Sequence, residues 1–247
     1  MTRFLPAVRP YRGGQPAAHL DAVNGGYRYP SVFKDRREAG QLLATAVQDL
    51  PNLKRPIVLA LPRGGVPVGF EVARRLHAPL DVLVVRKLGT PGQEELALGA
   101  VAFGGASYLN TDLITELQLP EPVLDEIREQ ELAEVMRRNE RYRGDRPWPD
   151  LRGRSVIIVD DGAATGATAE AAIAALRSQG PAEIVVALPV APSDTCARLR
   201  EAADRLVCLR SPELFLALGS WYLDFDQVSD EEVRELLRRS VEAAEAA

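Results

Sequence analysis

Short apolar runs that alternate with amphipathic segments constrain the fold of this chain more than any other feature. The runs lie at residues 57–61, 81–85, 98–103, 155–159 and 183–188. Amphipathic segments separate them, and in residues 35–50 apolar side chains recur at the spacing of one helix face. Strands that alternate with helices predict an α/β fold with a mainly parallel central sheet flanked by helices. The near-continuous apolar character of the runs indicates strands that are buried on both faces.

Composition and charge narrow the range of partners. The chain has 247 residues, of which 46% are hydrophobic and 26% charged, and its net charge is -5. A negative chain of ordinary composition gives no reason to expect a nucleic-acid partner. No apolar stretch approaches the ~20 residues of a membrane span, and the first residues lack a signal-peptide core. We therefore expect a cytoplasmic protein without a membrane partner, whose two cysteines are buried thiols.

The domain organisation is expected to be simple. One domain is predicted over residues 31–247, preceded by an arm or tail at 1–30 that is rich in Pro, Gly and Arg. Residues 122–143 are predicted to form a long helix with solvent-facing arginines and an apolar stripe of Leu124, Ile127, Leu132, Val135 and Met136. Ser229 and Glu232 stand in capping-box register before a final helix whose predicted buried edge is Val233, Leu236, Leu237 and Val241.

Two adjacent acids, Asp160 and Asp161, directly follow the apolar run 155–159. The carboxyl ends of strands are where open α/β sheets bind ligands. Adjacent carboxylates repel each other unless something compensates their charge, and no basic residue stands close to them in the sequence. Ribose hydroxyls or a hard cation such as Mg²⁺ would meet this requirement.

Small residues and threonines follow the acid pair and lead into a predicted helix. A small-residue turn lets backbone N–H groups approach a ligand, and a helix N-terminus favours an anion. The Walker A spacing is absent, which argues against a P-loop NTPase. The alternative is a plain strand-to-helix turn with the acids as caps, but acids, small residues and threonines together favour a phosphate site. Its candidate residues are Ala163, Ala164, Thr165, Gly166, Ala167 and Thr168.

A second candidate anion site follows the run 57–61. Arg63, Gly64 and Gly65 stand between this run and a predicted helix, so a guanidinium lies beside another helix N-terminus. A tight turn with an exposed arginine is the alternative interpretation. Taken alone, the two interpretations are about equally supported, and the acid pair elsewhere in the chain favours the anion site.

Two further segments carry candidate residues. Arg86 and Lys87 are predicted to end a strand, and residues 88–95 lack core-forming residues, which suits a mobile lid. Glu95 is a candidate in this lid, although a solvated role is favoured for it when it is considered alone. Near the C-terminus Trp221 and Tyr222 cluster with Asp224 in a chain that is only 6% aromatic. These side chains could bind a planar base or equally pack the last helix onto the sheet.

Residues 156–168, VIIVDDGAATGAT, closely resemble the motif by which type I phosphoribosyltransferases bind phosphoribosyl pyrophosphate, PRPP. The resemblance implies that Asp160 and Asp161 hold the ribose hydroxyls of PRPP and that residues 163–168 wrap its 5′-phosphate. It also implies a pyrophosphate loop at residues 63–65, where the family often has a non-proline cis peptide. Gly162 and Ala163 are smaller than the branched residues usual in the family.

The resemblance continues in the family's order over roughly residues 33–235. The segments FKDRREAG, LPRGGVPVG and RKLGTPGQEELALGAVA look like a bacterial group of phosphoribosyltransferases whose substrate is usually unassigned. The resemblance implies that Arg86 and Lys87 neutralise the Mg²⁺-pyrophosphate leaving group and that Glu95 fixes the closed loop. It implies a hood from residues 31–50 and about 210–228. Mg²⁺ is expected to bind mainly through PRPP, with no all-protein metal site.

We therefore expect this chain to transfer the phosphoribosyl group of PRPP to a nitrogen nucleophile, with a purine base favoured, and to release pyrophosphate. Its partners are then PRPP and a small-molecule acceptor, as in purine salvage. A regulator that senses PRPP or a nucleotide on the same fold is the alternative. A phospho-receiver domain fits less well, because the run 183–188 ends without another acid. The identity of the acceptor stays open, and so does a homodimer, which is common for this fold.

Overall fold

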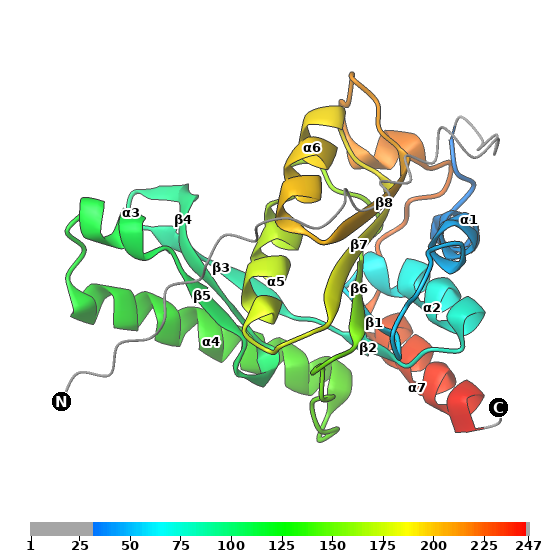
Figure 1. Ribbon diagram of the computed structural model, residues 1–247, viewed down its shortest axis with the longest axis horizontal. Helices are drawn as coiled ribbons and strands as arrows, with labels where there is room; N and C mark the ends of the chain where they lie inside the picture. The colour runs from blue at the N-terminus through cyan, green and yellow to red at the C-terminus, as the bar shows by residue number, and fades with distance from the viewer. Residues whose placement is uncertain (1–31, 246–247) are drawn as a thin grey trace.

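The computed structural model describes residues 32–245, except for the side chains of residues 94, 95, 244 and 245. The predicted arm at 1–30 lies outside the described residues. The centre of the molecule is a five-stranded, wholly parallel sheet in the order β2-β1-β6-β7-β8 (Figure 1). Its strands are β1 (Ile57–Ala60), β2 (Leu80–Val82), β6 (Ser155–Val159), β7 (Glu183–Val190) and β8 (Arg205–Arg210). The predicted fold class is confirmed.

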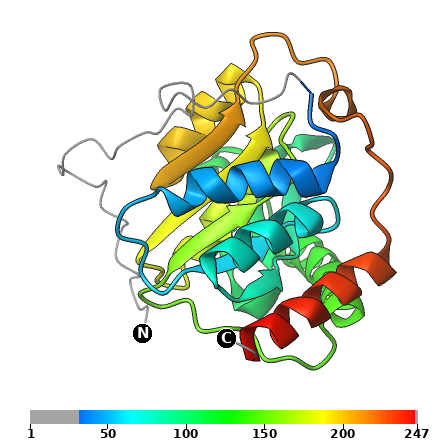
Figure 2. The same ribbon diagram turned by 90° about the vertical axis from the view of Figure 1, so that its right-hand side faces the viewer.

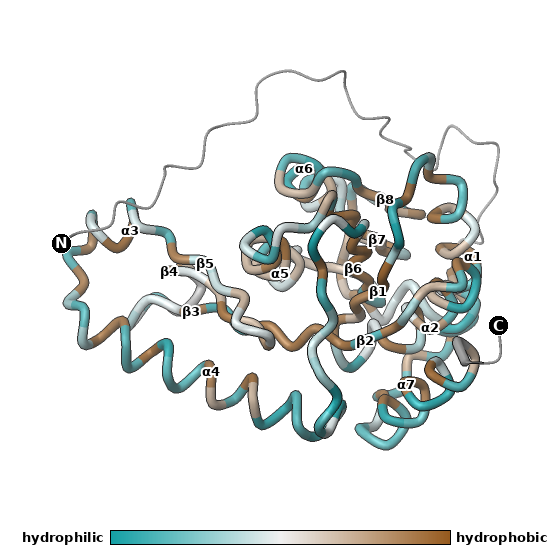
Figure 3. The backbone as a smooth tube through the Cα atoms, turned by 60° about the horizontal axis from the view of Figure 1, so that its bottom comes forward, coloured by the Kyte–Doolittle hydropathy of each residue, from teal (hydrophilic) through white to brown (hydrophobic). Residues whose placement is uncertain are grey.

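Helices cover both faces of this sheet, as Figures 1 and 2 show. On one face lie α1 (Arg36–Gln48), α2 (Gly65–Leu76) and α7 (Asp230–Glu245), and on the other lie α5 (Ala167–Arg177) and α6 (Ser193–Ala202). Alternate residues of β1 enter different cores, because Val58 packs with the first group of helices and Leu59 with the second. This explains why the inner positions of the central strands are apolar on both faces, as the brown segments of Figure 3 show.

A smaller antiparallel sheet lies beside the parallel one (Figure 1). It consists of β3 (Val85–Thr90), β4 (Gln93–Ala102) and β5 (Ser107–Leu109), which a 3-10 turn (Phe103–Gly105) helps to connect. Two helices, α3 (Thr111–Glu116) and α4 (Glu121–Arg143), complete this part. The predicted run 98–103 therefore belongs to a hairpin sheet, and the run 81–85 is divided between β2 and β3. A short apolar run has the same appearance in either kind of sheet.

The segment predicted to be a lid forms the end of a hairpin whose strand register shifts on both sides of Gly89. Thr90 pairs with Gln93, and Gly92 has a φ of 76° in the turn between the two strands. Leu88 is fully buried, so the prediction that residues 88–95 lack core-forming side chains is wrong at this position. The prediction that Arg86 and Lys87 end a strand is also wrong, because both stand near the start of β3. Cross-strand backbone hydrogen bonds create a hairpin without needing an apolar sequence.

Helix α4 begins and ends close to its predicted limits, but its faces differ from the prediction. Leu124 and Val135 are buried, whereas Leu132 and Met136 are exposed, because the helix contacts the hairpin along a narrow stripe. Arg143 contradicts the prediction of solvent-facing arginines, since its side chain is 0% exposed. In α7, the Ser229 hydroxyl caps the Glu232 N–H as predicted, at 3.1 Å.

The remaining predictions on the fold concern the buried edge of α7, the two cysteines and membrane-spanning helices. Val233 and Leu237 of α7 are buried, but Val241 is 40% exposed. Cys196 and Cys208 are thiols with buried side chains, as predicted. Among residues 32–245, no helix combines the length and the apolar character that crossing a membrane requires.

Candidate functional site

Two loops that are far apart in the sequence meet at the carboxyl ends of β1 and β6. The Leu61 N–H donates to the Val159 carbonyl at 2.8 Å and so joins the two strand ends. A Cβ atom on Gly64 would lie 2.0 Å from Asp161 Oδ2, and one on Gly65 would lie 2.6 Å from the Val159 oxygen. The glycines therefore allow the turn before α2 to touch the acid pair. The peptide bond between Pro62 and Arg63 is cis, as the resemblance implies.

The acid pair lies at the end of β6 in a largely buried position. The Asp161 N–H donates to Asp160 Oδ1 at 2.9 Å, and Asp161 is only 7% exposed. Burial and the adjacent Asp161 raise the pKa of the Asp160 carboxyl well above its usual range. The mutual repulsion inferred from the sequence is therefore present in the folded chain.

Arg36, which the sequence analysis did not single out, compensates part of this charge. Its Nε lies 2.7 Å from Asp161 Oδ2, and its guanidinium carbon lies 3.9 Å from the centre of the Phe225 ring. A further nitrogen donates to the Asp226 carbonyl at 2.7 Å. Arg36 is the first residue of α1, more than a hundred positions before the acids, so no local spacing connects them. The available signals were its place after a helix cap and its occurrence in the segment FKDRREAG, which resembles the family.

The loop at residues 163–168 is held from behind by α6. Its carbonyl groups accept hydrogen bonds, at Ala164 from the Thr195 hydroxyl at 2.9 Å and at Thr165 from Arg198 at 2.7 Å. Because a peptide N–H points opposite to the carbonyl of the same trans peptide unit, the following N–H groups point away from α6. Helix α5 then begins at Ala167, and Thr168 is exposed in its first turn. The loop thus has the form of a backbone anion cradle.

Gly162 and Ala163, at the start of this loop, make different contacts. Gly162 has a φ of 146°, and a Cβ there would lie 2.3 Å from Leu218 Cδ1, so a larger residue does not fit. The Ala163 N–H donates to the Val190 carbonyl at 3.0 Å, which fixes the loop to β7. Contact with Leu218 therefore accounts for the glycine at position 162.

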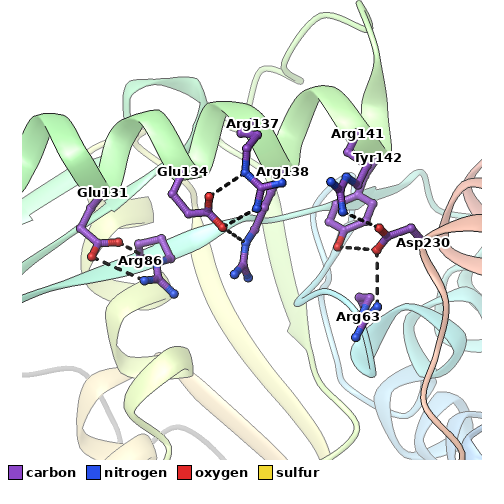
Figure 4. Close-up of polar contacts among 9 residues, drawn as sticks. All are labelled: Arg63, Arg86, Glu131, Glu134, Arg137, Arg138, Arg141, Tyr142 and Asp230. Carbon is purple, nitrogen blue, oxygen red and sulfur yellow. Dashed lines mark hydrogen bonds and ion pairs between the residues drawn. The ribbon is translucent and has the colours of Figure 1, made fainter.

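Figure 4 shows how the candidate anion-binding arginines are held. Arg63 Nη1 lies 3.6 Å from Asp230 Oδ1, at the start of α7. Asp230 also accepts hydrogen bonds from Arg141 at 2.8 Å and from the Tyr142 hydroxyl at 3.0 Å, both on α4. The Arg63 side chain, 35% exposed, is therefore oriented by two helices and remains accessible to a ligand.

The middle of α4 holds Arg86. Its Nε donates to Glu131 at 2.6 Å, and this hydrogen bond raises the pKa of the Arg86 guanidinium. Lys87 follows Arg86 in β3, and Glu95 stands in β4 with a side chain outside the described part of the structure. These three candidates therefore belong to the antiparallel sheet, whereas the acid pair belongs to the parallel one.

The predicted hood segments are hydrogen-bonded to each other. Phe33 exchanges backbone hydrogen bonds with Trp221 and Leu223, and the Asp224 N–H donates to the Lys34 carbonyl at 2.9 Å. Trp221 stacks on Phe215 with their ring centres 6.3 Å apart, and Asp224 is exposed. The C-terminal segment thus lies against residues at the start of α1.

Tyr222 occupies a more internal place in the same segment. Its ring contacts Phe33 and Phe225, with centres 5.5 Å and 4.9 Å away, and its hydroxyl donates to the Asp161 carbonyl. Burial and the nearby Asp161 raise the pKa of this phenol. Tyr222 therefore packs the C-terminal segment against Phe33 and the end of β6, and these contacts do not involve the last helix.

The fold is that of an α/β protein, and the acid pair and the backbone cradle at the carboxyl edge of its parallel sheet form a candidate site for a phosphorylated ligand. The family model of the phosphoribosyl transferase domain matches residues 34–221, and the chain belongs to this family.

Several known proteins are similar to this chain. The "Putative phosphoribosyl transferase Rv0571c" of Mycobacterium tuberculosis (strain H37Rv) is 48% identical over 209 residues, which are 85% of this chain and 47% of the relative. The chain thus spans about half the length of the curated relatives that it matches. The crystal structure of TT1426 from Thermus thermophilus is 45% identical with a TM-score of 0.78, and the match covers 84% of this chain and 98% of that one.

Proposed function

We propose that this chain transfers the phosphoribosyl group of PRPP to a nitrogen nucleophile and releases pyrophosphate. The observation that carries the proposal is the contact between the Gly64–Gly65 turn and the acid pair. It places a candidate pyrophosphate loop beside candidate ribose ligands, with the cradle for the 5′-phosphate directly after them. These three sites follow the order of groups in PRPP. Family membership supports the same reaction.

Each candidate residue receives a proposed role. Asp160 and Asp161 bind the ribose hydroxyls. The loop at residues 163–168 binds the 5′-phosphate through its threonines and through N–H groups other than that of Ala163, which donates to Val190. Arg63, with the backbone at Gly64 and Gly65, binds the pyrophosphate. The guanidinium beside a helix N-terminus suits a multiply charged anion. Arg86, Lys87 and Glu95 are proposed to act on the leaving group from the hairpin.

The proposed reaction requires mainly positioning of the two reactants and charge stabilisation of the leaving pyrophosphate. The Asp161 carboxylate is already paired with Arg36, so we assign Mg²⁺ no protein ligands and expect the oxygens of PRPP to hold it. When bound, Mg²⁺ neutralises part of the charge on the pyrophosphate. Arg63 and Arg86 add positive charge through N–H donors that their carboxylate partners leave available.

A nucleobase, with a purine favoured, is the proposed acceptor. We assign the hood to residues 31–50 and about 210–228 of a single domain, and Trp221, Tyr222 and Asp224 to the base side of the site. The backbone pairing of Phe33 with Trp221 supports this assignment, because it brings both hood segments together. The burial of Tyr222 favours a supporting role beneath the base. The exposed Asp224 carboxylate is suited to reading the edge of a purine.

Two measurements test the proposed function. Calorimetry with PRPP and Mg²⁺ is expected to show saturable binding, and an assay of pyrophosphate release with each common nucleobase is expected to respond to one of them. Binding without release from any nucleobase would favour the alternative, a regulator that senses PRPP or a nucleotide. No binding of PRPP would contradict the proposed site itself.

Replacing Arg86 with alanine is expected to lower kcat by about 100-fold while changing the affinity for ribose 5-phosphate little, because the guanidinium stabilises charge that develops on the leaving group. Steady-state kinetics and calorimetry measure the two quantities. Arg128→Ala is the matched control, since Arg128 forms an exposed ion pair with Asp125 on α4. Equal losses of turnover and of ribose 5-phosphate affinity in Arg86→Ala would contradict the leaving-group role.

A further inference from the structure

Arg36 connects three separate parts of the chain at the acid pair. It begins α1, it pairs with Asp161 at the end of β6, and it lies over Phe225 in the C-terminal segment. The side chains of Arg36 and Asp161 are only 12% and 10% exposed. Removing one partner of an ion pair so well shielded from water leaves the other charge buried without a counterion.

The geometry of this ion pair leaves the acid able to bind a ligand. Arg36 donates through Nε to Oδ2 of Asp161, whereas a carboxylate offers about four acceptor positions on its two oxygens. The carbonyl of Asp161 is fixed separately by the Tyr222 hydroxyl. Main chain and side chain of Asp161 are thus both held by residues of the proposed hood.

We propose that Arg36 is a positioning residue for ribose recognition: it fixes the orientation of the Asp161 carboxylate and links the hood to the PRPP site. The inference rests on the proposed function, because the ribose of PRPP is the ligand that Asp161 is proposed to bind. It assigns a role in PRPP affinity to a residue outside the PRPP motif. It also means that the packing of Phe225 against Arg36 contributes to ribose binding.

The charged groups around Arg36 predict a specific pH dependence of PRPP binding. The groups that face one another here are Arg36, Asp160, Asp161 and the Tyr222 phenol. Burial and Asp161 raise the pKa of Asp160, and Arg36 opposes this increase. Removing the guanidinium therefore raises the pKa further, so the ionised pair that binds ribose is lost at a higher pH. The acidic limb of PRPP binding is expected to move upward.

Three variants separate orientation from charge and from helix position. Arg36→Met removes the charge and keeps much of the apolar stem, whereas Arg36→Lys keeps the charge but lacks the planar fork that pairs with Asp161 and stacks on Phe225. Arg37→Met is the matched control, because Arg37 is the next residue of α1 and its side chain is 72% exposed. Calorimetry with PRPP and Mg²⁺ is performed on each full-length protein from about pH 5 to about pH 9.

At neutral pH we expect Arg36→Met to bind PRPP at least about tenfold more weakly, with its acidic limb shifted to higher pH. Arg36→Lys is expected to bind PRPP several-fold more weakly, with no shift in the acidic limb of its pH profile. Arg37→Met is expected to bind PRPP as the unmodified protein does. If thermal unfolding shows that Arg36→Met does not fold, the PRPP affinity of Arg36→Lys alone tests the positioning role. Binding by Arg36→Lys equal to that of the unmodified protein would overturn the positioning role. Absence of PRPP binding by the unmodified protein would instead overturn the proposed function, and the role of Arg36 with it.

Discussion

Replacing Gly64 with alanine is expected to weaken PRPP binding by about 30-fold to about 100-fold, because overpacking of this kind costs about 2–3 kcal/mol. The new Cβ would lie 2.0 Å from Oδ2, 2.5 Å from Cγ and 2.9 Å from Oδ1 of Asp161. The carboxylate cannot withdraw freely, since Arg36 holds its Oδ2 and the Tyr222 hydroxyl holds the main-chain carbonyl of the same residue. Either the acid or the pyrophosphate loop must move away from its place.

The backbone at Gly64 makes this substitution informative. Its φ of -59° and ψ of -34° are values that alanine adopts readily, so no conformational penalty accompanies the clash. Calorimetry measures the loss of PRPP affinity, and circular dichroism checks that the fold is kept. Unchanged affinity in a folded Gly64→Ala protein would show that the two loops need not touch for PRPP to bind.

Replacing Asp81 with alanine is expected to produce the largest loss of stability, about 3–5 kcal/mol in the free energy of unfolding. Arg143 donates to both oxygens of Asp81, at 2.7 Å and 2.9 Å, and its own side chain is 0% exposed. Without Asp81 a fully buried guanidinium loses its counterion. The guanidinium carbon also lies 5.1 Å from the centre of the Phe103 ring, so it has little room to move to water.

Urea unfolding measures this loss. The matched control is Asp125→Ala, which breaks the ion pair with Arg128 at the surface of the same helix. Exposed pairs contribute about 0.2–1 kcal/mol, so the control is expected to unfold close to the unmodified protein. Similar losses in the two variants would mean that burial of the Asp81–Arg143 pair adds nothing to its contribution.

The central sheet could be predicted because its strands carry a strong local signal. The run 155–159 coincides with β6, and the helix predicted at 122–143 differs from α4 by one residue at its start. The strand β8 and the helix α6 were not predicted. The sequence RLVCLR has arginines at both ends of β8, and these positions are half-buried at the edge of the sheet. The hairpin sheet was mistaken for central strands because pairing direction leaves no trace in a short apolar run.

The candidate site was predictable where a motif is contiguous. Asp160, Asp161 and Gly64 were identified from their local sequence, and the structure brings them together. Arg36 and Asp230 were missed because their importance arises from contacts with residues more than a hundred positions away. Charged residues are common at the start of a helix, and each of them could pair with many groups elsewhere in the chain. Only the folded chain shows which carboxylate or guanidinium each of them meets.

Helix α4 sets the spacing between Arg63 and Arg86 in Figure 4, because it carries groups that hold both of them. Glu131, which holds Arg86, and Tyr142, which helps to hold Arg63 through Asp230, are three turns apart on nearly the same side of the helix, about 16 Å along its axis. A single inserted residue between them would rotate one anchor by about 100° relative to the other. The number of residues between Glu131 and Tyr142 thus sets the distance between the turn at Arg63 and strand β3. Insertions or deletions between these two anchors are consequently expected to be tolerated only as whole turns.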